Sequence, residues 1–165
     1  MTRWLRYLWA APATAAGLIL GALVCALGAS ARVADGVLEV AGGRLAGRVG
    51  SGDAGRHGGF VAITFGHVVI GQSHAVLAGL RAHEHEHVRQ YERWGALFFA
   101  AYLGSSAVQW VNGRDPYRDN RFERQARAAE QATHVEQVGP VEHVGEDSHA
   151  WQAELSSRAA GRLRG

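Results

Sequence analysis

Residues 80–95, LRAHEHEHVRQYERWG, contain three histidines and three glutamates, and one frame within them reads H-E-x-x-H. Its members are His83, Glu84 and His87. Residues four apart share one face of a helix, so the two imidazoles can converge on one metal ion. Zinc lowers the pKa of a bound water towards neutrality, and Glu84 could accept its proton as that water attacks a carbonyl. The spacing therefore predicts the zinc-binding helix of a hydrolase.

A catalytic zinc site needs a third protein ligand and leaves one position open for water. That ligand should come from a later helix, and Glu123 in NRFERQARAA is the best candidate. Asn120-x-x-Glu123 is also a capping box, in which Glu123 would bond back to the start of its own helix. The sequence leaves both roles of Glu123 open.

Other interpretations of the His-rich segment need no catalysis. Glu84 and Glu86 could pair with Arg89 or Arg93 on a solvated helix face. A His-rich tract could also bind metal ions loosely, with His85 and the histidines of the C-terminal tail taking part. The H-E-x-x-H frame is therefore suggestive, and the elements around it have to decide.

Four more polar residues bear on the site. His67 and His74 could approach a metal, but their positions indicate a strand and its connection to the helix. The tetrahedral oxyanion of peptide hydrolysis needs a donor, and Tyr117 or His134 could supply it. Nothing in the sequence chooses between these two.

The elements that must position these residues can be read from their periodicity. Residues 37–40, 60–65 and 67–70 alternate or are β-branched and are separated by glycines, which predicts a small antiparallel sheet. From Ser73 onward the apolar residues follow a helical period. A further helix is predicted from about Asn120 through RFERQARAAEQA.

The motifs of residues 60–130 resemble those of gluzincin-type metallopeptidases. These include the membrane-embedded prenyl-protein and heat-shock protease group and the zincin-like domain associated with bacterial contractile injection systems. That domain has a strand with T-x-G, then A-H-E-x-x-H-V-x-Q, then an E-x-E-A-type helix. The matching residues are Thr64 and Gly66, then Ala82, His83, Glu84, His87, Val88 and Gln90, and finally Glu123 and Ala126.

The resemblance implies zinc as cofactor, His83, His87 and Glu123 as its ligands, and Glu84 as catalytic base. One position departs from the family pattern. The family often has an aspartate four residues after the ligand glutamate, where it orients a histidine ligand, and this chain has Arg127. Without an orienting carboxylate the metal site would be weaker or the protein inactive.

The N-terminus predicts a membrane segment. Residues 7–31 carry no charge and follow Arg3 and Arg6, so residues 1–31 are long enough for an anchor that crosses a bacterial membrane once. A cleaved signal peptide, with residues 29–31 (ASA) as cleavage site, is the competing interpretation and predicts secretion.

A second uncharged stretch covers residues 94–113. If it crossed a membrane, Glu123 would be separated from His83 and His87, because no later apolar segment brings the chain back. This stretch is therefore expected either to lie in a membrane interface, beside the arginines that follow it, or to form the domain core.

The chain of 165 residues is long enough for one modest domain. Its net charge of +2 gives no nucleic-acid footprint, and the only cysteine, Cys25, excludes an intrachain disulfide. The predicted partners are membrane lipid and a peptide or protein substrate. The sequence predicts no oligomeric state.

We thus expect an α+β protein: an N-terminal transmembrane helix, a small antiparallel sheet, and a helical zincin-like half, with the zincin-like domain over residues 32–133. Residues 134–165 are expected to form a flexible polar tail with a possible short helix. The predicted function is that of a membrane-anchored zinc metallopeptidase. The alternative is a non-enzymatic membrane protein that uses a zincin-like scaffold with structural zinc or none.

Overall fold

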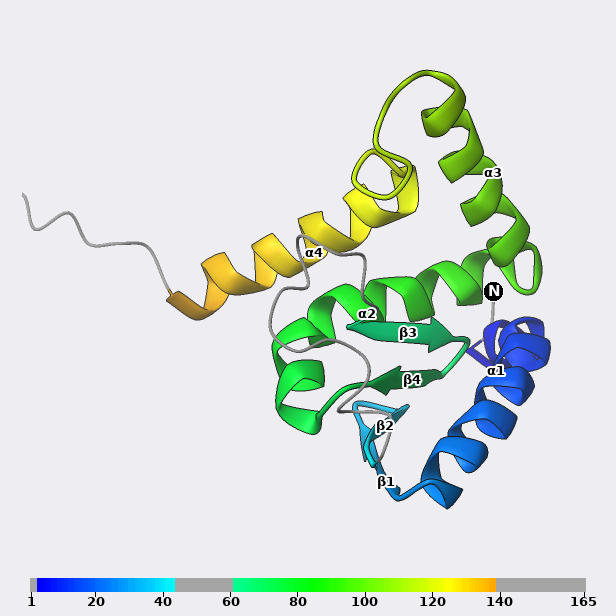
Figure 1. The fold of residues 1–165 in the computed structure, drawn as a ribbon, viewed down its shortest axis with the longest axis vertical. Coiled ribbons are helices and arrows are strands. Elements are labelled where there is room, and N and C mark those ends of the chain that lie inside the picture. The colour runs from blue at the N-terminus through cyan, green and yellow to red at the C-terminus, as the bar shows by residue number, and fades with distance from the viewer. Residues whose placement is uncertain (1–2, 44–60, 139–165) are drawn as a thin grey trace, which may run out of the picture. The chain divides into compact units, whose positions relative to one another are not determined.

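The computed structural model of the chain describes residues 3–43 and 61–138, and the statements below concern those residues. Residues 1–134 form one compact unit and residues 135–165 a second. The elements in chain order are α1 (Arg3–Ala26), β1 (Ala29–Ala34), β2 (Val37–Gly42), β3 (Ala62–Phe65), β4 (Val68–Gly71), α2 (His74–Trp94), α3 (Leu97–Val111) and α4 (Arg121–Val138) (Figure 1). The predicted α+β layout is confirmed, with an apolar N-terminal helix, a small sheet and a helical second half.

The sheet has four strands in the order β1-β2-β4-β3. β1 with β2, and β3 with β4, form antiparallel hairpins whose turns contain Gly36 (φ 82°) and Gly66 (φ 58°). The hairpins meet through β2 and β4, which run parallel. The sheet is therefore mixed, whereas the sequence indicates only antiparallel pairs, because glycine turns define each hairpin but not how two hairpins join. β1 is an addition to the predicted strands.

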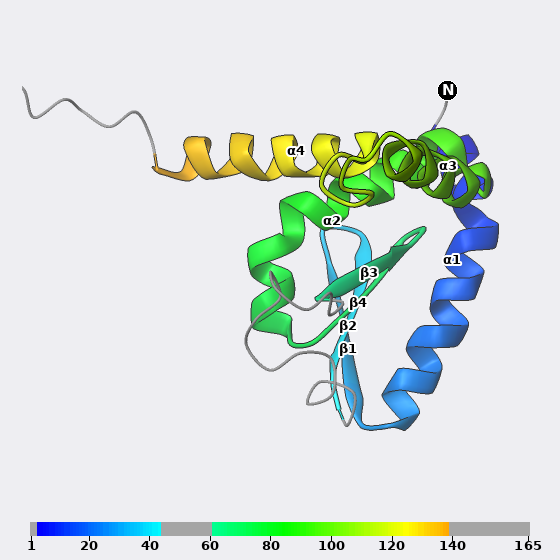
Figure 2. The ribbon, with the colours of Figure 1, turned by 45° about the horizontal axis from the view of Figure 1, so that its top comes forward.

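Two helices cover opposite faces of this sheet. On one face Val37 packs with Leu77 and Val88 of α2. On the other face Val40 packs with Val24 of α1. Alternate residues of a strand point to opposite sides, so β2 contributes to both cores. Figure 2 shows the sheet between α1 and α2.

The face of α1 that meets the sheet is made of small residues. A Cβ at Gly17 would lie 2.8 Å from the Phe65 carbonyl oxygen, and one at Gly66 would lie 2.6 Å from the Thr14 backbone nitrogen. The Thr14 hydroxyl also accepts a hydrogen bond from the His67 backbone N–H (3.1 Å). Thus α1 is packed into the fold. By length and composition it is also, among the described residues, the one helix that could cross a membrane or act as a signal sequence.

α2 begins where the sequence predicts. The Ser73 side chain accepts a hydrogen bond from the Val76 backbone N–H (3.2 Å) and caps the helix. The helix ends at Gly95, whose φ of 59° suits glycine. A Cβ at that position would lie 2.6 Å from the Trp9 ring nitrogen, so the glycine also lets α1 approach the end of α2.

α3 is packed against the domain on one side only. Phe98 is its one buried residue, and its outer half is exposed. One side of residues 94–113 thus belongs to a hydrophobic core cluster, and the other side is exposed. The aromatic cluster that Phe98 joins contains Ala10 of α1, Tyr91 of α2 and Phe122 of α4, so α3 is attached mainly through its inner face.

α4 extends past the predicted start of the tail. It continues to Val138, so residues 134–138 are helical and the predicted tail begins too early. A polar run with good helix formers can extend a helix whose first turns are packed. The rest of the predicted tail, residues 139–165, lies outside the described residues.

One buried ion pair ties the sheet to α2. The Glu39 carboxylate forms ion pairs with two arginines. Nε of Arg81, on α2, lies 2.9 Å from Oε1, and Nη2 of Arg32, on β1, lies 2.7 Å from Oε2. Glu39 is 2% exposed, and both its carboxylate oxygens are bound. We call Arg32, Glu39 and Arg81 the sheet ion pair.

Candidate metal centre

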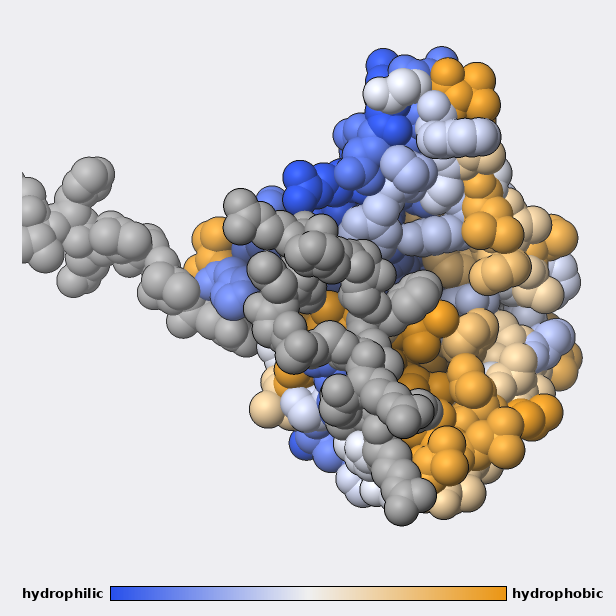
Figure 3. All heavy atoms as spheres, viewed as in Figure 1, coloured by the Kyte–Doolittle hydropathy of each residue, from blue (hydrophilic) through white to orange (hydrophobic). Residues whose placement is uncertain are grey.

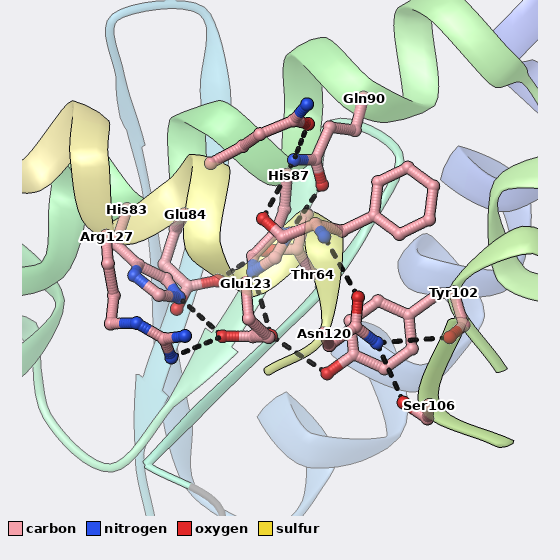
Figure 4. Close-up of polar contacts among 12 residues, drawn as sticks. Thr64, His83, Glu84, His87, Gln90, Tyr102, Ser106, Asn120, Glu123 and Arg127 are labelled. Atoms are coloured by element: carbon pink, nitrogen blue, oxygen red, sulfur yellow. Dashed lines mark hydrogen bonds and ion pairs between the residues drawn. The ribbon is translucent and has the colours of Figure 1, made fainter. Parts of the chain in front are cut away.

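Two helices bring the predicted site residues together. His83, Glu84 and His87 lie on one face of α2, and Glu123 lies in the first turn of α4 (Figure 4). We call these four residues the site cluster. All are buried, with exposed fractions of 8% or less. One ligand atom from each of His83, His87 and Glu123 lies within 4.8 Å of the others, so the group could hold a metal ion.

The distances within the group are those expected around one metal. His83 Nε2 lies 3.5 Å from Glu123 Oε2, and His87 Nε2 lies 3.4 Å from Glu123 Oε1. Both are longer than a good charge-assisted hydrogen bond. Two ligand atoms at about 2.0–2.1 Å from a tetrahedral zinc are about 3.3 Å apart. The two histidines and the glutamate therefore offer the donor types and the proximity that a metal site needs.

The Glu123 carboxylate is oriented by a neighbour on α3. The Tyr102 hydroxyl donates a hydrogen bond to Oε1 (2.8 Å), whereas Oε2 is buried and has no hydrogen-bond partner among the described residues. Burial raises the pKa of Glu123, but the contacts with His83 and His87 lower it more, and the net pKa is well below its ordinary value. The lowered pKa favours the ionised carboxylate, and its Oε2 faces His83 and Arg127 without a hydrogen bond to either.

Glu123 does not cap α4. Asn120 caps α4, since its side-chain oxygen accepts a hydrogen bond from the Phe122 backbone N–H (2.9 Å). The Asn120 backbone N–H is bound by the Tyr117 carbonyl oxygen (3.2 Å). Glu123 instead points towards the histidines of α2 (Figure 4).

A glutamine fixes the orientation of His87. Gln90 Nε2 donates to the Phe122 carbonyl oxygen (3.1 Å), which can only accept. Gln90 Oε1 is therefore the atom 2.9 Å from His87 Nδ1, and we infer that Nδ1 carries a proton. The other nitrogen, Nε2, then faces Glu123. Burial lowers the pKa of His87, but Glu123, Glu84 and Gln90 raise it, and the net shift is upward.

A second carboxylate stands behind His83. His83 Nδ1 lies 3.5 Å from Glu130 Oε2 on α4, while its Nε2 faces Glu123. Glu130 is seven residues after Glu123, which places both on one face of the helix. Because a carboxylate only accepts, this arrangement also favours a proton on Nδ1 and leaves Nε2 for a metal.

Arg127 does not take the place of the expected aspartate. Its Nη1 lies 3.9 Å from Glu123 Oε2, its Nη2 donates to the Arg118 carbonyl oxygen, and its guanidinium lies 6.0 Å from the centre of the Tyr117 ring. The sequence comparison with the family pattern missed Glu130, which supplies a carboxylate one helical turn later. Its spacing of seven residues from Glu123 was the available signal.

The candidate base is held by the sheet. Glu84 Oε2 accepts a hydrogen bond from the Thr64 hydroxyl (2.6 Å), and both residues are buried. Thr64 belongs to β3, an edge strand that pairs only with β4 among the described strands. The solvated-face interpretation applies to Glu86, which pairs with Arg89 (2.7 Å) on the exposed side of α2, but not to Glu84.

Three other histidines of the described residues lie outside the site cluster. His67 stacks on Tyr7 at 4.3 Å and lies 3.2 Å from Glu92, and His74 lies 3.0 Å from the Ser30 hydroxyl. His67 lies in the turn between β3 and β4, as expected, whereas His74 is the first residue of α2. His85 lines a separate pocket of about 140 Å³ on another side of α2.

The two candidate oxyanion donors differ in their surroundings. Partial desolvation and the nearby Glu123 carboxylate raise the pKa of Tyr117, although 55% of this residue is exposed. His134 is exposed on α4. Of the two, only Tyr117 interacts with a residue of the site cluster, Glu123.

Comparison with known proteins gives no assignment: no family model, no curated protein and no solved structure matches the chain.

Proposed function

We propose that this chain is a zinc-dependent metallopeptidase of gluzincin type. The observation that carries the proposal is the convergence of His83, His87 and Glu123 at metal-ligand separations, with Glu84 beside them on α2. A bound zinc would supply a water of lowered pKa and would polarise the substrate carbonyl.

The chain's own residues would perform the remaining work. Glu84 is placed by Thr64 to accept the proton of the attacking water and to pass it to the leaving amine. The edge of β3 that no described strand covers could pair with an extended peptide. Tyr117 is the proposed oxyanion donor, because its hydroxyl interacts with the Glu123 carboxylate of the site cluster.

A structural metal site is the competing function, and burial favours it. The four residues of the site cluster are each 8% exposed or less, and a structural zinc is enclosed by its ligands. In that case Glu84 would serve only to bind Thr64.

The experiment that separates the two is peptide hydrolysis by zinc-loaded, detergent-purified protein on a fluorogenic peptide library. Glu84→Gln should reduce kcat by about 10²–10⁴-fold and retain zinc. Glu86→Gln is the matched control, because it makes the same change at a partly exposed position of α2, where the side chain pairs with Arg89, and it should retain activity. Equal activity in the Glu84→Gln variant and the wild type would contradict the proposed mechanism.

We further propose that α1 is retained and holds the chain at a bacterial membrane. The candidate cleavage site at residues 29–31 lies in β1, where it is paired with β2. Loss of α1 would uncover Val40, Val68 and Phe98. Mass spectrometry of the full-length product should therefore find the N-terminal segment intact.

A further inference from the structure

We propose that the outer faces of α1 and α3 together form one lipid-facing surface, so that the protein lies on a single leaflet and α1 does not cross the bilayer. This inference rests on the proposed membrane location. It replaces the single crossing of the membrane that the sequence predicts for the N-terminal segment. The occupant of the surface is the hydrocarbon of one membrane leaflet.

α1 has two faces of different character. The inner face carries Ala10, Thr14, Gly17 and Gly21, and it packs on the sheet and on the aromatic cluster. The outer face carries large apolar side chains that are 39–84% exposed. These are Trp4, Leu5, Leu8, Trp9, Leu18, Ile19, Leu20 and Leu23. Residues 7–26 contain no charge, so nothing on this face opposes insertion into lipid.

α3 repeats the arrangement. Its inner face holds Phe98 and Tyr102, and its outer half exposes Leu97, Phe99, Leu103, Val108, Trp110 and Val111. In both ribbon views α3 and α1 lie on the same side of the molecule, and Figure 3 shows apolar side chains along that side. Two helices on the same side of the molecule, each with apolar side chains on its outer face, offer a wider surface than a lone anchor requires.

The packing of α1 argues against a crossing. α1 contacts the sheet and α2 along its length, so a crossing α1 would carry them into the bilayer. His67 binds Thr14 at the middle of α1 and lies 3.2 Å from Glu92. That polar pair would then sit near the bilayer centre, where ionisable groups are costly. With α1 in the plane of the leaflet, the same residues stay on the protein side of the helix.

Charge at the end of α3 suits the same orientation. The loop after α3 and the first turn of α4 expose four arginines against two aspartates, Asp115 and Asp119, and so leave net positive charge beside one end of the apolar surface. The arginines are Arg114, Arg118, Arg121 and Arg124. Arginines beside an inserted apolar face are attracted to anionic lipid headgroups.

The geometry can be tested by the sidedness of two positions. In a Cys25→Ala background, Thr2→Cys and Glu136→Cys are introduced separately into the full chain in bacterial cells and treated with an impermeant maleimide. Thr2 precedes α1, and Glu136 is an exposed residue near the end of α4. We expect both cysteines to be labelled from the same side. Labelling from opposite sides would overturn the inference while leaving the membrane location intact.

The contribution of α3 is tested with vesicles of phosphatidylcholine and phosphatidylglycerol. Leu103→Glu should weaken vesicle partitioning by roughly tenfold or more, because it places a charge on the lipid-facing side. Val135→Glu is the matched control, since Val135 is exposed outside this surface and should tolerate the change. An unchanged partition for Leu103→Glu, or burial of the surface in a dimer that does not bind vesicles, would overturn the inference. Zinc content and hydrolysis in detergent do not depend on either outcome.

Discussion

Two glutamates of this protein are almost equally buried, and they are bound in different ways. Glu39 of β2 is 2% exposed and Glu123 of α4 is 3% exposed. The shortest contacts of Arg81 and Arg32 with Glu39 are 2.7–2.9 Å long and leave neither carboxylate oxygen free, and a further Arg81 contact is 3.5 Å long. The nitrogens around Glu123 stand at 3.4–3.9 Å, and its Oε2 has no hydrogen-bond partner among the described residues.

Burial and a lowered pKa therefore do not distinguish the two residues. Burial raises the pKa of each, and basic neighbours lower it to a net value below the ordinary one. What differs is the spacing of the partners and their type. The arginines contact Glu39 at the distances of a structural ion pair. The two imidazoles lie farther from Glu123, at separations that two ligands of one cation could have.

The largest expected difference in stability concerns Glu39→Gln. This change leaves Arg81 and Arg32 without their acceptor, and we expect a loss of about 2 kcal/mol in the free energy of unfolding, limited because both arginines are partly exposed. Glu123→Gln should change stability by less than about 1 kcal/mol, because an amide can still accept from Tyr102 and donate to a histidine. Urea unfolding of the two variants compares them. Equal losses would remove the distinction between the two glutamates.

The role of Glu130 sharpens the account of the site. Glu130→Gln should weaken zinc binding by roughly tenfold, because the carboxylate behind His83 is lost. Glu136→Gln is the control on the same helix, where the side chain is exposed. Competition with a chromophoric chelator measures both affinities. If the two variants bind zinc alike, Glu130 does not orient His83.

Acid should weaken the sheet ion pair in a defined direction. The folded pKa of Glu39 lies below its ordinary value of 4.5, because Arg81 and Arg32 outweigh the effect of burial. The stability that it contributes is thus fully present above about pH 4.5 and is lost as the pH falls through the folded pKa. The difference in unfolding free energy between wild type and Glu39→Gln should shrink from about pH 7 to about pH 3. A constant difference would contradict the ionised pairing.

The core of the site could be predicted because its spacing is local. His83, Glu84 and His87 share a helix face at fixed offsets, and Glu123 follows from the need for a third ligand on another helix. Gln90, Tyr102 and Glu130 were harder to assign. Their roles depend on how α3 and α4 pack against α2, which no local pattern specifies.

The fold shows the same division. The hairpins follow from their glycine turns, but the parallel pairing of β2 with β4 depends on contacts between distant segments. Hydropathy predicts a membrane segment at α1 but does not show which face of the helix packs on protein, because packed and lipid-facing helices can be equally apolar. The small residues Ala10, Gly17 and Gly21 of α1 indicate that one face of this helix packs against protein.

The most direct test of the central claim is the metal content of detergent-purified protein, measured by mass spectrometry for wild type, Glu39→Gln, Glu123→Gln and His87→Ala. The account predicts about one zinc per chain in the wild type and in Glu39→Gln, and loss of that zinc in Glu123→Gln and His87→Ala. A wild-type chain without stoichiometric zinc, or a Glu123→Gln variant that retains it, would contradict the claim that His83, His87 and Glu123 form a metal centre.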